Sequence, residues 1–195
     1  MSSQKENTDN KKWRFFMGLH KLLSLKTKQN SQTALHIFHQ NIWGLKLKMD
    51  ELMCMFDNCG LSPHTSRLSE HYLVDHKLLM IKPNNYYLAS RFSCQSYSGG
   101  GICMYINTYV ESSMIDLSQY CIEKVIEVCA AQINIRNHFI ILLCIYRFSS
   151  GDFGEFVVQL DLILKYLQKP KLEFIICGAF NANFFIVSSS AQQLT

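Results

Sequence analysis

The sequence predicts an α+β domain in which sheets and helices form separate layers. Several β-rich runs follow one another along the chain, and only two segments have clear helical spacing. Strands and helices therefore do not alternate in the regular way that gives a doubly wound parallel sheet. With 195 residues, of which 48% are hydrophobic and 17% charged, the chain is large and apolar enough for a sizeable core.

The first part of the chain divides into a polar stretch and the start of the domain. Residues 1–33 are dotted with lysine, and we predict a flexible basic tail with one short amphipathic helix around Trp13 to Leu25. The run "ALHIFHQNI" then alternates between apolar and polar residues, which predicts a strand. The run "GLKLKMDELMCMFDNCG" has apolar residues at helical spacing and predicts a helix that ends at Gly60.

The rest of the chain is mostly β-rich. Four strands are predicted in "YYLASRF", "GGGICMYINTYV", "EKVIEVCAAQINI" and "HFIILLCIYRF". A second helix is predicted in "GDFGEFVVQLDLILKYLQK", with Asp152 as its cap and Pro170 beyond its end, and a buried strand follows in "KLEFIICGAF". The predicted domain spans residues 34–185, and we expect residues 186–195 to be an unstructured end.

Composition limits the function without identifying it. The net charge of +4 permits an anionic partner, but such modest basicity is common among soluble proteins. The eight cysteines form no CxxC pair, and most lie among aliphatic residues, so we expect reduced thiols and no disulfide-linked partner. No apolar run reaches membrane-spanning length and the first residues do not form a secretory signal, so we expect an intracellular protein, nuclear or cytoplasmic.

Polar side chains follow the ends of four runs, which is where functional groups gather on a rigid scaffold. They are Asn41, Glu70, Tyr146 and Asn181. Taken singly, an asparagine in such a place is most often a turn former, and a tyrosine is equally well a core residue with its hydroxyl at the rim. Glu70 alone is consistent with a solvated carboxylate. The set is therefore more informative than any of its members.

Two short patterns are similar to ligand sites only superficially. His71, Asp75 and His76 have a metal-like spacing, but one short cluster is weak support, and we interpret the histidines as surface residues. The run "SGGGI" lacks the lysine and hydroxyl residue of a phosphate-binding P-loop, and we predict that it opens a strand.

Several motifs, taken in order, resemble one known family. The runs "HQNIWGLKLKMDEL", "LSEHYL", "SGGGICMYI", "EKVIEVCAAQI", "IYRFSSGDFGEF" and "FIICGAFNAN" resemble the endonuclease/exonuclease/phosphatase family. They look most like the endonuclease domain of LINE-type (non-long-terminal-repeat) retrotransposons. The resemblance covers roughly residues 35–185. It implies a four-layered α/β sandwich that cleaves phosphodiester bonds of DNA with Mg²⁺.

The resemblance also implies roles for the strand-end residues. Asn41 and Glu70 match the positions that bind or support the metal, and Tyr146 matches a tyrosine that helps to hold the scissile phosphate. The family's G-D-F-N motif matches the run that ends at Asn181, which would contact the phosphate. In that motif the Asp orients or deprotonates the attacking water, and here its position is occupied by Ala179.

The chain departs from the family pattern in two further places. The family's S-D-H segment has no counterpart after Phe185, which predicts a C-terminally truncated domain with an open sheet edge and an incomplete shell for Mg²⁺. The run "SPHTSRLSE" is unusually polar for the buried second strand, and Arg67 there would need a partner.

These features favour an endonuclease-like domain of retrotransposon origin whose chemistry is lost or severely impaired. General base catalysis alone is worth about 10²–10⁴-fold in rate, and an alanine cannot supply it. An alternative is a non-catalytic nucleic-acid-binding remnant that uses the basic tail and the former phosphate groove. A third alternative is a relic that forms no stable fold.

Overall fold

The described part of the chain forms two sheets and three α-helices. The computed structural model describes residues 13–17, 20–26, 34–168 and 172–181. Its elements in chain order are β1 (Trp13–Met17), β2 (His20–Lys26), β3 (Ala34–Asn41), α1 (Met49–Asn58), β4 (Thr65–Ser69), α2 (Asp75–Leu78), β5 (Tyr86–Phe92), β6 (Ile102–Asn107), β7 (Glu111–Ile115), a 3₁₀ turn (Ser118–Tyr120), β8 (Ile126–Ile135), β9 (His138–Arg147), α3 (Phe153–Leu167) and β10 (Glu173–Ala179).

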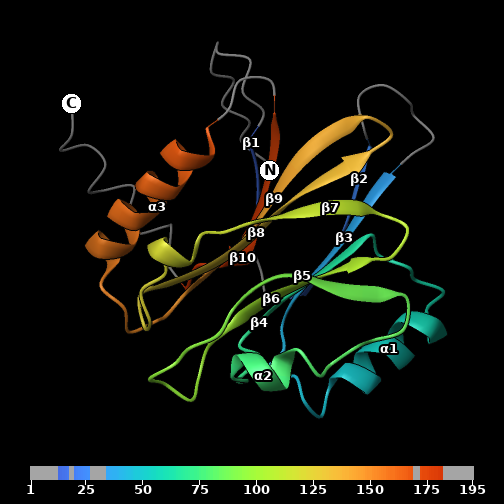
Figure 1. Cartoon of the computed structure of the whole chain (residues 1–195), viewed down its shortest axis with the longest axis horizontal. Helices are drawn as coiled ribbons and strands as arrows, with labels where there is room; N and C mark the ends of the chain where they lie inside the picture. The colour runs from blue at the N-terminus through green and yellow to red at the C-terminus, as the bar shows by residue number, and fades with distance from the viewer. Residues whose placement is uncertain (1–12, 18–19, 27–33, 169–171, 182–195) are drawn as a thin grey trace.

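The strands are arranged in two five-stranded sheets that pack face to face (Figure 1). The first sheet has the order β1-β10-β9-β8-β7, and the second has the order β2-β3-β4-β6-β5. Helix α3 covers the outer face of the first sheet, whereas α1 and α2 lie against the outer face of the second (Figure 1). The predicted four-layered α/β sandwich is therefore confirmed.

Three apolar clusters join the four layers. The cluster between the two sheets includes Ile37 and Leu142, and neither side chain is exposed to solvent by more than 1%. A second cluster packs Phe156 and Leu167 of α3 on the first sheet, and a third packs Phe56 of α1 on the second. Strands β8 and β9 contribute to two of these clusters, which explains why their sequences are nearly continuous apolar runs rather than alternating ones.

The prediction of a helix over Trp13 to Leu25 is wrong, because this stretch forms two strands. β1 pairs in parallel with β10, and β2 pairs antiparallel with β3, so each strand extends one of the two sheets. The unpaired N–H and C=O groups of an edge strand form hydrogen bonds with a neighbouring extended segment. This long-range pairing outweighs a weak helical pattern in the local sequence. The predicted tail thus contains two strands of the fold, and the remainder of residues 1–33 lies outside the described residues.

β10 is not an edge strand, since β1 pairs with it, and within the described residues β1 is the outermost strand on that side of the sheet. All five residues of β1 pair with β10, from Trp13 opposite Phe174 to Met17 opposite Gly178. The predicted unstructured end, residues 186–195, lies outside the described residues. One strand was missed altogether: β7 has an exposed, polar sequence at a sheet edge and carries no alternating apolar signal.

The polar second strand does form, and its arginine is fully buried. Every residue of β4 is buried between β3 and β6. Arg67 has no exposed surface, and its Nη1 lies 2.5 Å from Cys177 Sγ on the opposite sheet. Its Nε and Nη2 atoms have no hydrogen-bond partner among the described residues. The partner that the sequence required is therefore a thiol, and the burial of this charge costs stability.

The thiol belongs to a row of three cysteines on neighbouring strands. Cys129 of β8 pairs with Cys144 of β9, which pairs in turn with Cys177 of β10. All three lie in the cluster between the sheets, and His39 Nδ1 lies 3.9 Å from Cys144 Sγ. No disulfide links any pair among the described residues, which include all eight cysteines. Within those residues no helix is long and apolar enough to cross a membrane.

Candidate active site

Glu70 is the centre of a hydrogen-bonded cluster at one end of the sandwich. Its Oε1 accepts a hydrogen bond of 2.6 Å from Asn41 Nδ2 and another of 2.7 Å from the Tyr146 hydroxyl. Its Oε2 accepts a short hydrogen bond from the Tyr72 hydroxyl. All three side chains donate to the carboxylate, so Glu70 is the shared acceptor of the cluster. The structure thus brings together three of the four predicted site residues.

The sheet topology explains why these side chains meet. Strands β3 and β4 are parallel neighbours, and Asn41 pairs with Ser69, so Asn41 ends beside Glu70. Tyr146 reaches the same carboxylate from β9 of the opposite sheet. Burial and the hydrogen bond to Glu70 both raise the pKa of Tyr146, because each disfavours a phenolate beside a carboxylate. The Tyr146 hydroxyl therefore acts as a hydrogen-bond donor here.

A glycine turn holds the Glu70 segment in place. The backbone N–H groups of His71 and Tyr72 donate to the carbonyl oxygens of Gly101 and Gly100, at 3.2 and 3.0 Å. Both glycines have left-handed backbones, with φ of 83° and 74°. A Cβ at Gly101 would lie 2.3 Å from the His71 ring, and one at Gly100 would lie 2.4 Å from Glu127 Oε1. The run "SGGGI" is therefore glycine-rich because of close packing, and it opens β6 as predicted.

Glu127 is a buried carboxylate that sequence reasoning missed. It has no exposed surface, and it accepts hydrogen bonds of 2.7 Å from the Gly101 backbone N–H and from Cys94 Sγ. Burial raises its pKa to about 7, although these two donors act in the opposite direction. It pairs with Tyr146 across β8 and β9 and supports the glycine turn. The available signal was a single acidic residue inside the apolar run "VIEVCAA".

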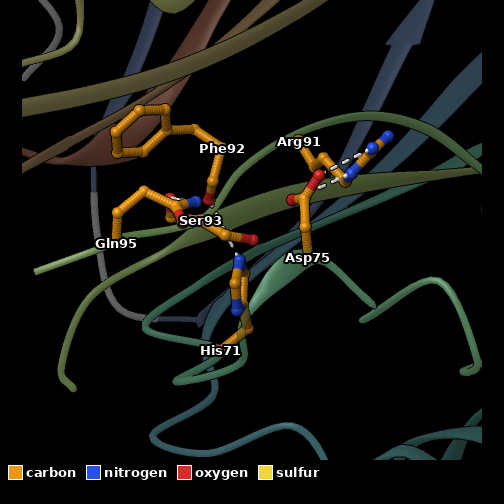
Figure 2. Close-up of polar contacts among 6 residues, drawn as sticks. All are labelled: His71, Asp75, Arg91, Phe92, Ser93 and Gln95. Carbon is orange, nitrogen blue, oxygen red and sulfur yellow. Dashed lines mark hydrogen bonds and ion pairs between the residues drawn. The ribbon is translucent and has the colours of Figure 1, made fainter. Parts of the chain in front are cut away.

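His71 is buried beneath the cluster, which corrects the interpretation of it as a surface residue. Its Nε2 lies 3.1 Å from the carbonyl oxygen of Phe92, as Figure 2 shows, and its Nδ1 accepts from Leu73 N–H at 3.0 Å. Burial lowers the His71 pKa to about 4, so the ring is neutral at neutral pH. Asp75 forms two hydrogen bonds with Arg91, at 2.8 and 3.1 Å (Figure 2). Both groups are thus engaged in structural contacts.

Ala179 and Asn181 lie beside Tyr146 but do not join the Glu70 cluster. Ala179 pairs with Tyr146 across β10 and β9 and is 6% exposed, in the apolar cluster between the sheets. Asn181 Nδ2 donates to the Arg147 carbonyl oxygen at 2.7 Å, and Arg147 Nη1 donates to the Asn181 carbonyl oxygen at 2.9 Å. The Asn181 amide therefore ties the end of β10 to the end of β9.

Two oxygen ligands suited to a hard cation lie next to each other in this cluster. Glu70 supplies a carboxylate, and Asn41 Oδ1 is buried without a hydrogen-bond partner among the described residues. Mg²⁺ commonly binds to one or two carboxylates together with water and phosphate oxygens. The pair therefore fits part of a Mg²⁺ shell. No group of three or more histidine, cysteine, aspartate or glutamate residues in the described ranges forms a fuller metal site.

The sequence matches no protein-family model and no curated protein, but the fold is similar to solved structures. The endonuclease domain of TRAS1, a telomere-specific non-LTR retrotransposon, has a TM-score of 0.54 at 14% identity, over 75% of this chain and 59% of that domain. D. rerio TDP2 complexed with a single-strand DNA product has a TM-score of 0.56 at 18% identity, over 80% of this chain and 64% of that chain. The human Nocturnin catalytic domain with bound sulfate has a TM-score of 0.56 at 14% identity, over 88% of this chain and 73% of that domain.

This chain thus spans less than two thirds of the length of the TRAS1 domain and of that TDP2 structure. At these identities the likeness concerns the fold, and it agrees with the two facing sheets and outer helices described above. The chain is a protein of the DNase I-like endonuclease/exonuclease/phosphatase fold.

Proposed function

We propose that this domain is related to the Mg²⁺-dependent DNA endonucleases of retrotransposons and that it binds nucleic acid but hydrolyses it poorly. One observation carries the proposal: a complete hydrogen-bonded cluster around Glu70 lies next to an alanine at position 179. The order of the sequence motifs and the similarity to the TRAS1 endonuclease domain support the retrotransposon relation.

The Glu70 cluster has the chemistry to hold a phosphate and its cation. Glu70 and Asn41 would hold Mg²⁺, which when bound would neutralise phosphate charge and stabilise the leaving oxygen. Tyr146 donates its hydroxyl at the edge of the cluster and is placed to donate to a phosphate oxygen instead. Asn41, Glu70 and Tyr146 therefore account for binding and orientation.

Among the described residues, the other carboxylate that pairs with the Tyr146 position, Glu127, does not replace the residue that would activate water. A carboxylate at position 179 would lie beside Tyr146, whereas a methyl group neither accepts a proton nor holds a water molecule. Glu127 also pairs with Tyr146, but it has no exposed surface and both of its oxygens are engaged. Hydrolysis by this chain should therefore be slower than in a protein with the Asp, by roughly 10²–10⁴-fold.

Restoring the carboxylate tests the proposal. Purified protein and an Ala179→Asp variant are incubated with supercoiled plasmid and Mg²⁺, and nicked circles are quantified over time. We expect little nicking by the unmodified protein and a marked gain in the variant. Ala179→Asn is the matched control, because it has the size of Asp but no basic oxygen pair, and it should show no gain. Efficient nicking by the unmodified protein that disappears in Glu70→Ala would refute the impairment.

A non-catalytic nucleic-acid-binding role is the second candidate. The net charge of +4 favours it, and so does the exposed Lys46, which follows Leu45, whose backbone N–H donates to the His71 carbonyl oxygen; the cluster itself does not require hydrolysis. Binding through phosphates releases counterions, so the affinity for an oligonucleotide should fall steeply as salt rises. Equal binding at low and high salt, or no binding at either, would eliminate this role.

A further inference from the structure

Three exposed aromatic residues lie on segments that contact Glu70 or the glycine turn beneath it. Trp43 is 66% exposed, Tyr72 is 43% exposed and Tyr97 is 40% exposed. We call these three residues the aromatic rim. Single exposed apolar side chains are common on proteins, but a group of aromatic rings around one polar cluster is not explained by packing.

Each member of the rim is tied to the Glu70 cluster by a specific contact. Trp43 precedes Gly44, whose backbone N–H donates to the Glu70 carbonyl oxygen at 2.8 Å. Tyr72 donates its hydroxyl to the Glu70 carboxylate. Tyr97 and Tyr72 line one shallow hollow together with Gly100, which belongs to the supporting glycine turn. Tyr72 therefore contacts the carboxylate itself, whereas Trp43 and Tyr97 lie on segments next to its backbone and its glycine turn.

The backbone at the rim is strained. Trp43 has a φ of 47°, and Tyr72 has a φ of 58°, the same as Glu70 between them in the chain. Residues with a bulky side chain rarely adopt this left-handed conformation, and such strain gathers at functional sites. Trp43 is both strained and mostly exposed, so it contributes little to the stability of the fold. Its aromatic surface is instead available to another molecule.

Lysine side chains accompany the two outer aromatic residues. Lys124 Nζ lies 4.8 Å from the centre of the Tyr97 ring. Lys48 Nζ donates to the Trp43 carbonyl oxygen at 3.0 Å and to the Ile42 carbonyl oxygen at 2.8 Å, which holds the amine at the base of the turn. The Tyr97 ring is thus paired with a cation, and an aromatic ring together with a cation is the combination that binds bases and phosphates of one strand.

We infer that the aromatic rim binds unpaired bases of a nucleic acid strand whose phosphate lies at the Glu70 cluster. The inference rests on the proposed function, since it takes the Glu70 cluster as the phosphate site. In a duplex the base faces are stacked on one another, so exposed rings at this site favour a single-stranded or frayed partner. Every base offers a face for stacking, so this binding should have little sequence preference.

Fluorescence anisotropy with two labelled probes tests the inference. One probe is a single-stranded oligothymidylate, and the other is a blunt duplex of the same length; both are measured with Mg²⁺, and gel electrophoresis of the recovered probes checks that neither has been cut. We expect the single strand to bind more tightly than the duplex. Trp43→Ala and Tyr97→Ala should each weaken single-strand binding by roughly tenfold or more, because stacking contributes about that much per base.

Two variants control for indirect effects. Tyr109→Ala removes a tyrosine that is 62% exposed at the opposite end of the second sheet, and it should leave the affinity unchanged. Trp43→Phe retains an aromatic face and should recover most of the loss seen in Trp43→Ala. Thermal melts followed by circular dichroism identify any variant that has lost its fold. If Trp43→Ala is unfolded, the single-strand affinity of Trp43→Phe and of Tyr97→Ala tests the inference instead.

The outcomes separate this inference from the proposed function. Equal affinity for both probes, or unchanged single-strand binding in Trp43→Ala and Tyr97→Ala, overturns the role of the rim. If nicking by the Ala179→Asp variant persists in that case, the proposed function stands without it. Absence of binding to either probe at low salt overturns the inference, and the rim would then be assigned to a protein partner.

Discussion

The end of β4 and the end of β10 flank the same tyrosine but have opposite surroundings. At the end of β4, Glu70 accepts hydrogen bonds from three side chains, and a glycine turn supports the segment from below. At the end of β10, Ala179 packs in an apolar cluster beside Tyr146. Under the proposed function, the groups that would hold a phosphate and the position that would supply the water-activating carboxylate lie on separate strands. One set can therefore be complete while the other is not.

The largest effect is expected from combining changes at both ends. In an Ala179→Asp background, Glu70→Gln keeps the size of the side chain but removes the charge that would hold a cation. We expect plasmid nicking to fall by roughly 10²-fold or more, because groups that act as a unit are not additive. Asp75→Asn, which alters a nearby carboxylate bound to Arg91, is the matched control. Equal losses in both variants would show that the Glu70 end has no special role.

The support beneath the Glu70 end should make stability depend on pH. Glu127 has a folded-state pKa of about 7, above its ordinary value of 4.5, so its contribution is present below pH 4.5 and is lost as pH rises through about 7. Glu127→Gln cannot ionise and should therefore raise Tm relative to the unmodified protein increasingly from pH 5 to pH 8. Thermal melts at four pH values measure this difference. A constant difference across the series would contradict the raised pKa.

Substitutions of Arg67 test the interior between the two sheets, which lies below the ends of β4 and β10. Its buried charge has a thiol partner and two nitrogen atoms without partners in the described residues, so Arg67→Met should increase the free energy of unfolding by about 1–4 kcal/mol. Arg67→Lys retains the charge and loses the reach to Cys177, and it should not be stabilising. Urea titrations measure both. A strongly destabilised Arg67→Met would show that the guanidinium is compensated by an anion, such as a thiolate in the cysteine row.

The smallest effect concerns one donor to Glu70. Tyr72→Phe removes a hydroxyl from a partly exposed side chain and should lower the free energy of unfolding by about 1 kcal/mol or less, because solvent replaces the lost hydrogen bond. Tyr109→Phe is the matched exposed control. Single-strand affinity should survive in Tyr72→Phe, since the ring remains. A large loss of affinity would mean that the hydroxyl, rather than the ring, contacts the partner.

Much of the candidate site followed from strand ends and motif order. Asn41, Glu70 and Tyr146 were selected from sequence, and they do meet, although their roles remain predictions. Tyr72 and Glu127 were missed for different reasons. Tyr72 lies two residues after Glu70, and only a left-handed turn directs its hydroxyl back to the carboxylate. Glu127 lies in a different sheet, and no local pattern indicates that it packs against a glycine turn 26 residues earlier.

The elements that local pattern alone predicts are those in which the pattern is strong. Long apolar runs specify β8, β9 and β10, and helical spacing specifies α1 and α3, because burial of one face is encoded within each segment. Long-range contacts in the folded chain are needed to explain three other features: the pairing of β1 and β2 with the two sheets, the burial of Arg67 against Cys177 and the glycine turn under Glu70. Each of these depends on residues far apart in the chain, where a neighbouring surface outweighs local preference.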